Sequence, residues 1–122
     1  MRVRERSALV VAAAVAAALV LGACSSPAQS YEDVDALAAA VSEAGVECSV
    51  VDRGPSAQLV NEVASCEGSG ATLYVFDSLD RLEEWKAVAG RLGPVVTGPN
   101  WAVVADTPTV RQLAETLHAE TT

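Results

Sequence analysis

The segment that decides the fold is ATLYVFDSLDRLEEWKAVAGRLGP, residues 71–94. Its Leu-Tyr-Val-Phe run at 73–76 predicts a strand covered on both faces, because apolar side chains point to both sides of it. The polar pair Asp77-Ser78 can cap a helix. Apolar residues then recur at intervals of three and four until Gly93-Pro94 ends the pattern. The predicted buried stripe comprises Leu79, Leu82, Trp85, Val88, Ala89 and Leu92.

Upstream of this unit the sequence predicts a helix and two strands. The helix spans residues 30–44, with Ser30 as its cap and acidic side chains in its first turn, where the helix dipole favours negative charge. Strands are predicted at 47–52 and 63–67. Between them, residues 57–62 fit a strand, a helical turn or a loop. Gly68-Ser69-Gly70 predicts a hairpin connection to the strand at 71–76.

Downstream, the sequence predicts two short strands and a helix. The strands cover residues 95–97 and 101–105, and Gly98-Pro99-Asn100 forms the turn between them. Thr107-Pro108 opens the last helix, with threonine as cap and proline at the first helical position. The final residues 121–122 are expected to fray.

The predicted order of elements is therefore α-β-β-β-α-β-β-α. This order predicts one α+β domain over residues 31–122, with an antiparallel-rich sheet and three helices packed mainly on one face. A helix connects the strand at 73–76 to the pair of strands that includes residues 101–105. If the strands at 73–76 and 101–105 run parallel, the connection is expected to be right-handed.

The first 23 residues have the layout of a secretory signal. Arg2, Arg4 and Arg6 form a positive start, and an apolar stretch at 8–23 follows. A membrane-spanning helix needs about 20 apolar residues, and this stretch has 16. A cleaved signal is therefore favoured over a permanent span.

Leu21-Gly22-Ala23-Cys24 resembles the bacterial lipobox. The resemblance implies that the Cys24 thiol receives a diacylglycerol and that the signal is cut just before it. Two acyl chains supply stable anchoring, so we expect the protein on the outer face of the cell membrane. The polar residues 24–30 would then form a flexible tether. The alternative is an ordinary secreted protein with a chance cysteine at position 24.

The three cysteines fit the same compartment. Lipid on Cys24 explains the odd count and leaves Cys48 and Cys66, which outside the cytoplasm favour a disulfide. The alternatives are free or reactive thiols, a redox pair or a metal site. A C-x-x-C motif is absent, and the single histidine, His118, lies far along the chain. We expect no metal and no cofactor.

The charge balance is strongly acidic. The whole chain has 8 basic and 16 acidic residues and a net charge of −8. Removing residues 1–23 takes away three arginines and one glutamate, which brings the net charge to −10. Phosphate contacts need clustered lysine and arginine, so nucleic acid is not expected as a partner. An acidic surface that keeps secreted domains apart explains the charge.

No catalytic constellation is visible in the sequence. Glu83 and Glu84 are adjacent, so on a helix they point about 100° apart and do not converge. Asp77 and Asp80 fit helix capping better than calcium binding. An enzyme would require Asp77 or Glu83 in a cleft near His118. We therefore predict a protein that is not an enzyme.

The most distinctive local feature is Gly98-Pro99-Asn100-Trp101. In one interpretation it is a tight turn whose indole covers one end of the sheet. In the other, Trp101 and Asn100 are exposed and contact a partner, since tryptophan is common at interaction hot spots.

A second resemblance covers most of the domain. The paired cysteines, the 73–77 segment, Trp85 and the 98–101 turn are similar to small lipoproteins of high-GC Gram-positive bacteria. The resemblance implies the disulfide and the layout above, and it assigns no activity or site residue. From the small disulfide-bonded domain, the lipid signal and the lack of a catalytic constellation, we expect a non-catalytic binding or scaffolding domain that contacts an envelope protein or a small ligand. The alternative is a carrier with an apolar cavity lined by Leu73, Val75 and Trp85.

Overall fold

The computed structural model describes residues 28–54 and 59–121. These residues confirm the α+β class and the predicted order, with one short strand added at the end. The elements are α2 (Val34–Glu43), β1 (Cys48–Gly54), β2 (Glu62–Gly68), β3 (Thr72–Val75), α3 (Leu79–Ala89), β4 (Val95–Thr97), β5 (Trp101–Val104), α4 (Thr107–Leu117) and β6 (Glu120–Thr121).

A single six-stranded sheet organises the domain. Its strand order is β1-β2-β3-β5-β4-β6, and every neighbouring pair is antiparallel. β3 lies inside the sheet, as its apolar run predicted. β3 and β5 are antiparallel neighbours. The right-handed connection was expected only if these two strands were parallel, so it does not apply. Helix α3 instead leads from β3 to β4, with β5 between the two strands.

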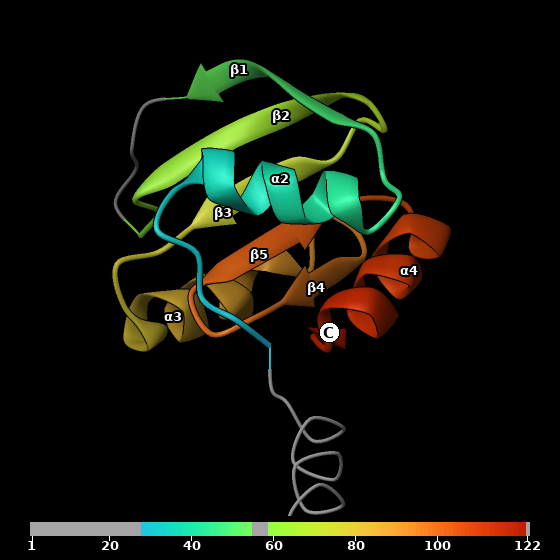
Figure 1. Cartoon of the computed structure of the whole chain (residues 1–122). Coiled ribbons are helices and arrows are strands. Elements are labelled where there is room, and N and C mark those ends of the chain that lie inside the picture. The colour runs from blue at the N-terminus through green and yellow to red at the C-terminus, as the bar shows by residue number, and fades with distance from the viewer. Residues whose placement is uncertain (1–27, 55–58, 122) are drawn as a thin grey trace, which may run out of the picture.

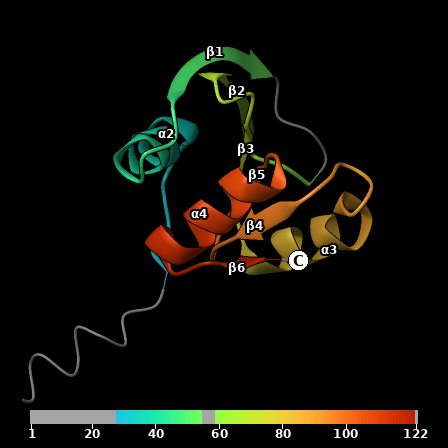
Figure 2. The same ribbon diagram turned by 90° about the vertical axis from the view of Figure 1, so that its right-hand side faces the viewer.

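The helices cover both faces of the sheet (Figures 1 and 2). α2 and α4 lie on one face, and α3 lies alone on the other. The prediction of helices mainly on one face thus holds for two of the three. Strand β3 explains the division, because Leu73 and Val75 point to the α2 and α4 side while Tyr74 points to α3.

The α3 side is the thinner of the two cores. Trp85 of α3 packs against Tyr74 and Phe76, with ring centroids 4.8 and 5.4 Å apart. Only part of the predicted stripe is buried, because a single helix meets the sheet along a narrow line. The buried members are Leu82, Trp85 and Ala89, while Leu79, Val88 and Leu92 are 58%, 63% and 52% exposed.

Three local predictions at the ends of elements were wrong. α4 is capped by Asp106, whose carboxylate accepts the Thr109 N–H, and not by Thr107, which is the first residue of the helix. α2 is capped by Asp33, whose carboxylate accepts the Ala36 N–H, and not by Ser30. The reason is that the chain before Asp33 is bonded to the β4–β5 turn and cannot join the helix. Thr121 does not fray, because it pairs with Val96 of β4, and residue 122 lies outside the described residues. In the segment left open at 57–62, residues 59–61 are irregular and β2 begins at Glu62, while 57–58 lie outside the described residues.

The predicted disulfide joins Cys48 of β1 to Cys66 of β2. β1 is an edge strand, and it pairs only with β2 within the described sheet. The Cys66 side chain belongs to the core beneath α2. The disulfide therefore links the edge of the sheet to its interior.

Replacing both cysteines, Cys48→Ala with Cys66→Ala, should lower the free energy of unfolding by about 3 kcal/mol. A cross-link over this sequence separation of 18 residues restricts the unfolded chain by about that amount. Urea unfolding of the two proteins measures the difference. Reduction of the wild-type disulfide should give the same loss, and Ser49→Ala in the same strand should give almost none. An unchanged unfolding midpoint in the double variant would contradict the stabilising role of the bond.

Candidate functional site

Trp101 lies where the N-terminal segment joins the fold. It is the first residue of β5, and its side chain is 0% exposed. Its indole Nε1 donates a hydrogen bond of 2.8 Å to the backbone carbonyl of Gln29. A buried indole N–H needs such an acceptor, and here the chain entering the domain supplies it.

Asn100 holds the same segment with both ends of its side-chain amide. Its Nδ2 donates to the Tyr31 carbonyl at 2.7 Å, and its Oδ1 accepts the Tyr31 N–H at 3.0 Å. The Tyr31 ring packs on the Trp101 ring, with centroids 5.9 Å apart. We call these four residues, Gln29, Tyr31, Asn100 and Trp101, the N-terminal clasp.

The phenol of Tyr31 is neutral in the clasp. Burial raises the pKa of Tyr31 above its ordinary value, and the nearby Glu43 carboxylate raises this pKa further. Ionisation of the phenol therefore does not disturb the clasp at neutral pH.

Gly98 makes room for the indole. Its N–H donates to the Trp101 carbonyl at 3.0 Å and closes the turn. A Cβ at position 98 would lie 2.2 Å from Trp101 Nε1 and 2.3 Å from Cε2. Only glycine allows this close approach of backbone and ring.

The interpretation of Trp101 and Asn100 as an exposed partner contact is not what the structure shows. Trp101 is inside the domain, and the Asn100 amide is occupied by Tyr31. The structure matches the other interpretation, in which the turn places the indole over one end of the sheet. The sequence could not reveal this, because Tyr31 is 69 residues away from Asn100.

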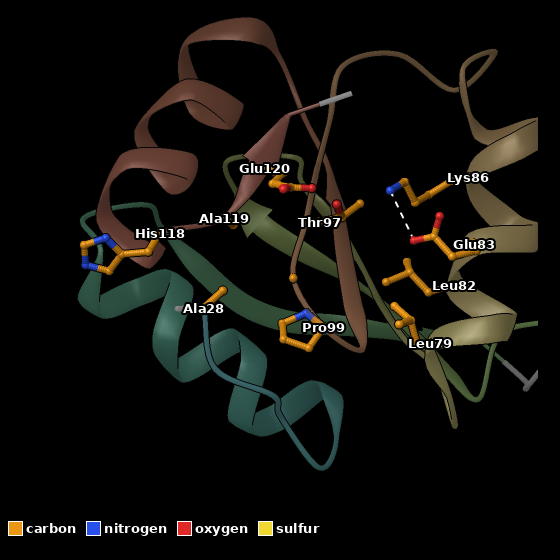
Figure 3. Close-up of a pocket in the computed structure, with 11 residues that line it drawn as sticks. Ala28, Leu79, Leu82, Glu83, Lys86, Thr97, Pro99, His118, Ala119 and Glu120 are labelled. Carbon is orange, nitrogen blue, oxygen red and sulfur yellow. Dashed lines mark hydrogen bonds and ion pairs between the residues drawn. The ribbon is translucent and has the colours of Figure 1, made fainter. Parts of the chain in front are cut away.

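A pocket of about 300 Å³ opens beside the clasp (Figure 3). One wall is α3, the opposite wall is the segment from α4 to β6, and the end of β4 with the following turn lies between them. Ala28, the first described residue, also lines it. The lining residues are Ala28, Leu79, Leu82, Glu83, Lys86, Thr97, Gly98, Pro99, His118, Ala119 and Glu120.

Charged side chains meet over this pocket. The Lys86 ammonium lies 3.3 Å from the Glu83 carboxylate, and the two side chains are 24% and 56% exposed. Glu120 extends from β6 toward Lys86, above the buried Thr97 (Figure 3). The Glu83–Lys86 spacing of three on a helix is visible in the sequence, whereas the approach of β6 to α3 is not.

Glu83 and His118 both line the pocket, which brings together two of the residues that an enzyme would require. The His118 ring points away from Glu83 in Figure 3, and Glu83 is paired with Lys86. Asp77 is exposed and does not line this pocket. The two titratable groups therefore share a pocket without facing each other.

The apolar cavity expected of a carrier was wrongly placed. Leu73 and Val75 belong to the core beneath α2 and α4, whereas Trp85 belongs to the core beneath α3. The sheet separates these side chains, so they cannot line one cavity. The pocket beside the clasp uses other residues of α3 and has polar groups in its walls.

The part of the chain that the structure describes carries neither a metal-binding cluster nor a membrane-spanning helix. There, no cluster of three or more histidine, cysteine or acidic residues could hold a metal ion. No helix among those residues is long and apolar enough to cross a membrane. Cys24 and the signal segment at 1–23 lie outside the described residues.

Comparison with protein-family models, with curated proteins and with solved structures finds no match to this chain.

The Gly98→Ala substitution should destabilise the domain by roughly 2 kcal/mol, because the added methyl group collides with the indole. Gly90→Ala is the matched control. A Cβ at position 90 meets nothing within 4 Å, and Gly90 has α-helical dihedrals. The stability of the Gly90→Ala variant should therefore equal that of the wild type or be slightly higher. Thermal unfolding of both variants measures the difference. Equal stability of the two variants would contradict the close packing of the turn.

The Asn100→Ala substitution should release the N-terminal segment. It removes two hydrogen bonds to Tyr31, which predicts a loss of about 1–3 kcal/mol and faster hydrogen exchange at the Tyr31 amide. The exposed Asn61, changed to alanine, is the control and should leave this exchange rate unchanged. Slow exchange at Tyr31 in Asn100→Ala would show that the clasp does not depend on this amide.

Proposed function

We propose that the chain is a lipoprotein held at the outer face of the cell membrane by lipid on Cys24. Residues 31–122 would act there as a non-catalytic binding or scaffolding domain. The observation that carries the proposal is the Cys48–Cys66 disulfide, which uses two of the three cysteines and leaves Cys24 for the lipid. Such bonds persist in oxidising compartments outside the cytoplasm.

The clasp supports a position close to the membrane. Four residues separate Cys24 from Gln29, whose carbonyl is bonded to Trp101. At no more than about 3.6 Å per residue, Gln29 lies within roughly 18 Å of the Cys24 backbone. A lipid on Cys24 would therefore hold the domain near the bilayer, with the end of the pocket at Ala28 among its nearest parts.

The side chains of the pocket favour binding over catalysis. Glu83 is neutralised by Lys86, and His118 does not face it. A general acid or base must reach the reacting atom by hydrogen bonding and is usually oriented by a second group. The pocket walls offer surfaces for contact and no oriented acid–base pair.

A second candidate function is carriage of a small ligand. The pocket between α3 and β6 favours it, since it lies between a helix and the sheet as a carrier site would. It would take a ligand with both apolar and polar parts.

We also propose that the chain belongs with the small lipoproteins of high-GC Gram-positive bacteria that its sequence resembles.

The intact mass of the protein from the membrane fraction of a bacterial host tests the anchor. It should fit a chain that begins at Cys24 with acyl chains attached, and reduction should add two hydrogens. Cys24→Ser should abolish the acyl mass and move the protein out of the membrane fraction. An unmodified mass in the medium would overturn the anchor, and the absence of a reducible bond would overturn the stated use of the cysteines.

A further inference from the structure

We infer that the pocket between α3 and β6 binds a small amphiphilic cation, a primary ammonium that carries a short apolar chain. The inference deepens the proposed binding function and rests on it for its biological setting. The site itself is made only of described residues.

The apolar half of the site is the wall formed by Leu79, Leu82 and Pro99. Leu82 is buried, but Leu79 is 58% exposed although it belongs to the apolar stripe of α3. Figure 3 shows Leu79 and Pro99 on facing sides of the lower end of the pocket. A short hydrocarbon chain between them would remove apolar surface from water, which favours binding.

The polar half of the site carries an excess of negative charge. Lys86 is compensated by Glu83. The Glu120 carboxylate is exposed, and within residues 28–54 and 59–121 it forms neither a hydrogen bond nor an ion pair. The carboxylates of Glu83 and Glu120 and the ammonium of Lys86 sum to −1, and the whole chain carries −8. Because Glu83 and Lys86 compensate each other, Glu120 decides the sign: it attracts an ammonium and repels a carboxylate.

The volume limits the size of the ligand. About 300 Å³ is at the lower end of pockets that hold small organic molecules. The site would hold an amine with a short chain, or the ammonium head of a larger amphiphile whose tail leaves through the opening. The nearness of Ala28 to Cys24 allows either source at the membrane surface.

Three probes with the same chain and different charge test the site: hexylammonium, hexanoate and hexanol. The chain purified from membranes is placed in phosphatidylcholine nanodiscs and titrated while amide shifts are followed by NMR. Hexylammonium should bind at least severalfold more tightly than the other two, with the largest shifts at Leu79, Thr97 and Glu120. Equal or tighter binding of hexanoate, or shifts centred elsewhere, would overturn the inference.

Variants on the two walls separate the charge from the apolar contact. Glu120→Gln should weaken hexylammonium binding by about two- to fivefold, which is the effect expected of an exposed charge pair. The affinity for hexanol should stay unchanged. Glu115 lies on the exposed surface of α4 outside the pocket, so Glu115→Gln should change the affinity for neither hexylammonium nor hexanol. Leu79→Ala should weaken both probes, whereas Leu92→Ala, at a similarly exposed leucine outside the pocket, should not.

Lys86 gives the sharpest test of the sign of the ligand. Lys86→Met keeps the half-buried stem and frees the Glu83 carboxylate, so hexylammonium should bind about two- to fivefold more tightly. A weaker interaction in this variant would mean that Lys86 itself contacts the ligand, and it would overturn the assignment of a cation.

The source of the ammonium is resolved by the lipid of the nanodisc. Phosphatidylethanolamine should compete with hexylammonium if the natural ligand is a lipid head, and should have no effect if it is a free amine. The same titration of the Cys24→Ser protein in solution needs no lipid on Cys24, so its failure would overturn only the ligand inference. A missing acyl mass in the same preparation would overturn only the anchor.

Discussion

Burial of the Trp101 indole is the constraint on which the rest of the structure depends. The ring belongs to the core beneath α2 and α4, and its N–H must find an acceptor inside the fold. Gln29 supplies that acceptor, and Gly98 leaves the space in which the ring lies. Together with Asn100, the indole fixes where the chain enters the domain.

The two faces of the sheet are covered unequally, and this creates the candidate site. α2 and α4 cover one face, and they are joined by the bond from the Gln112 side chain to the Ala44 carbonyl. α3 covers the other face alone, so Leu79 at its start is left at the rim of the pocket. β6 then supplies the opposite wall, because its pairing with β4 places Glu120 across from Lys86.

The proposed function brings these features together at the membrane. A disulfide links the edge strand to the sheet interior. In the proposal, the acidic surface would keep neighbouring domains apart, and a short tether would keep the pocket near the bilayer. The pocket has one compensated lysine and one uncompensated glutamate, a pattern that suits recognition of a positive charge more than proton transfer. Under the proposed function, the domain would bind at the membrane surface and would not catalyse a reaction there.

The sequence alone determined the class of fold and the order of its elements up to α4, and it favoured the pairing of Cys48 with Cys66. These follow from local patterns, namely apolar periodicity, glycine and proline at ends, and the count of cysteines. Only the tertiary structure decided which face each helix covers, where α2 begins, and that Trp101 is buried. Each of these depends on contacts between distant segments, such as Tyr31 with Asn100 and Glu120 with the α3 wall, and no local pattern encodes such contacts.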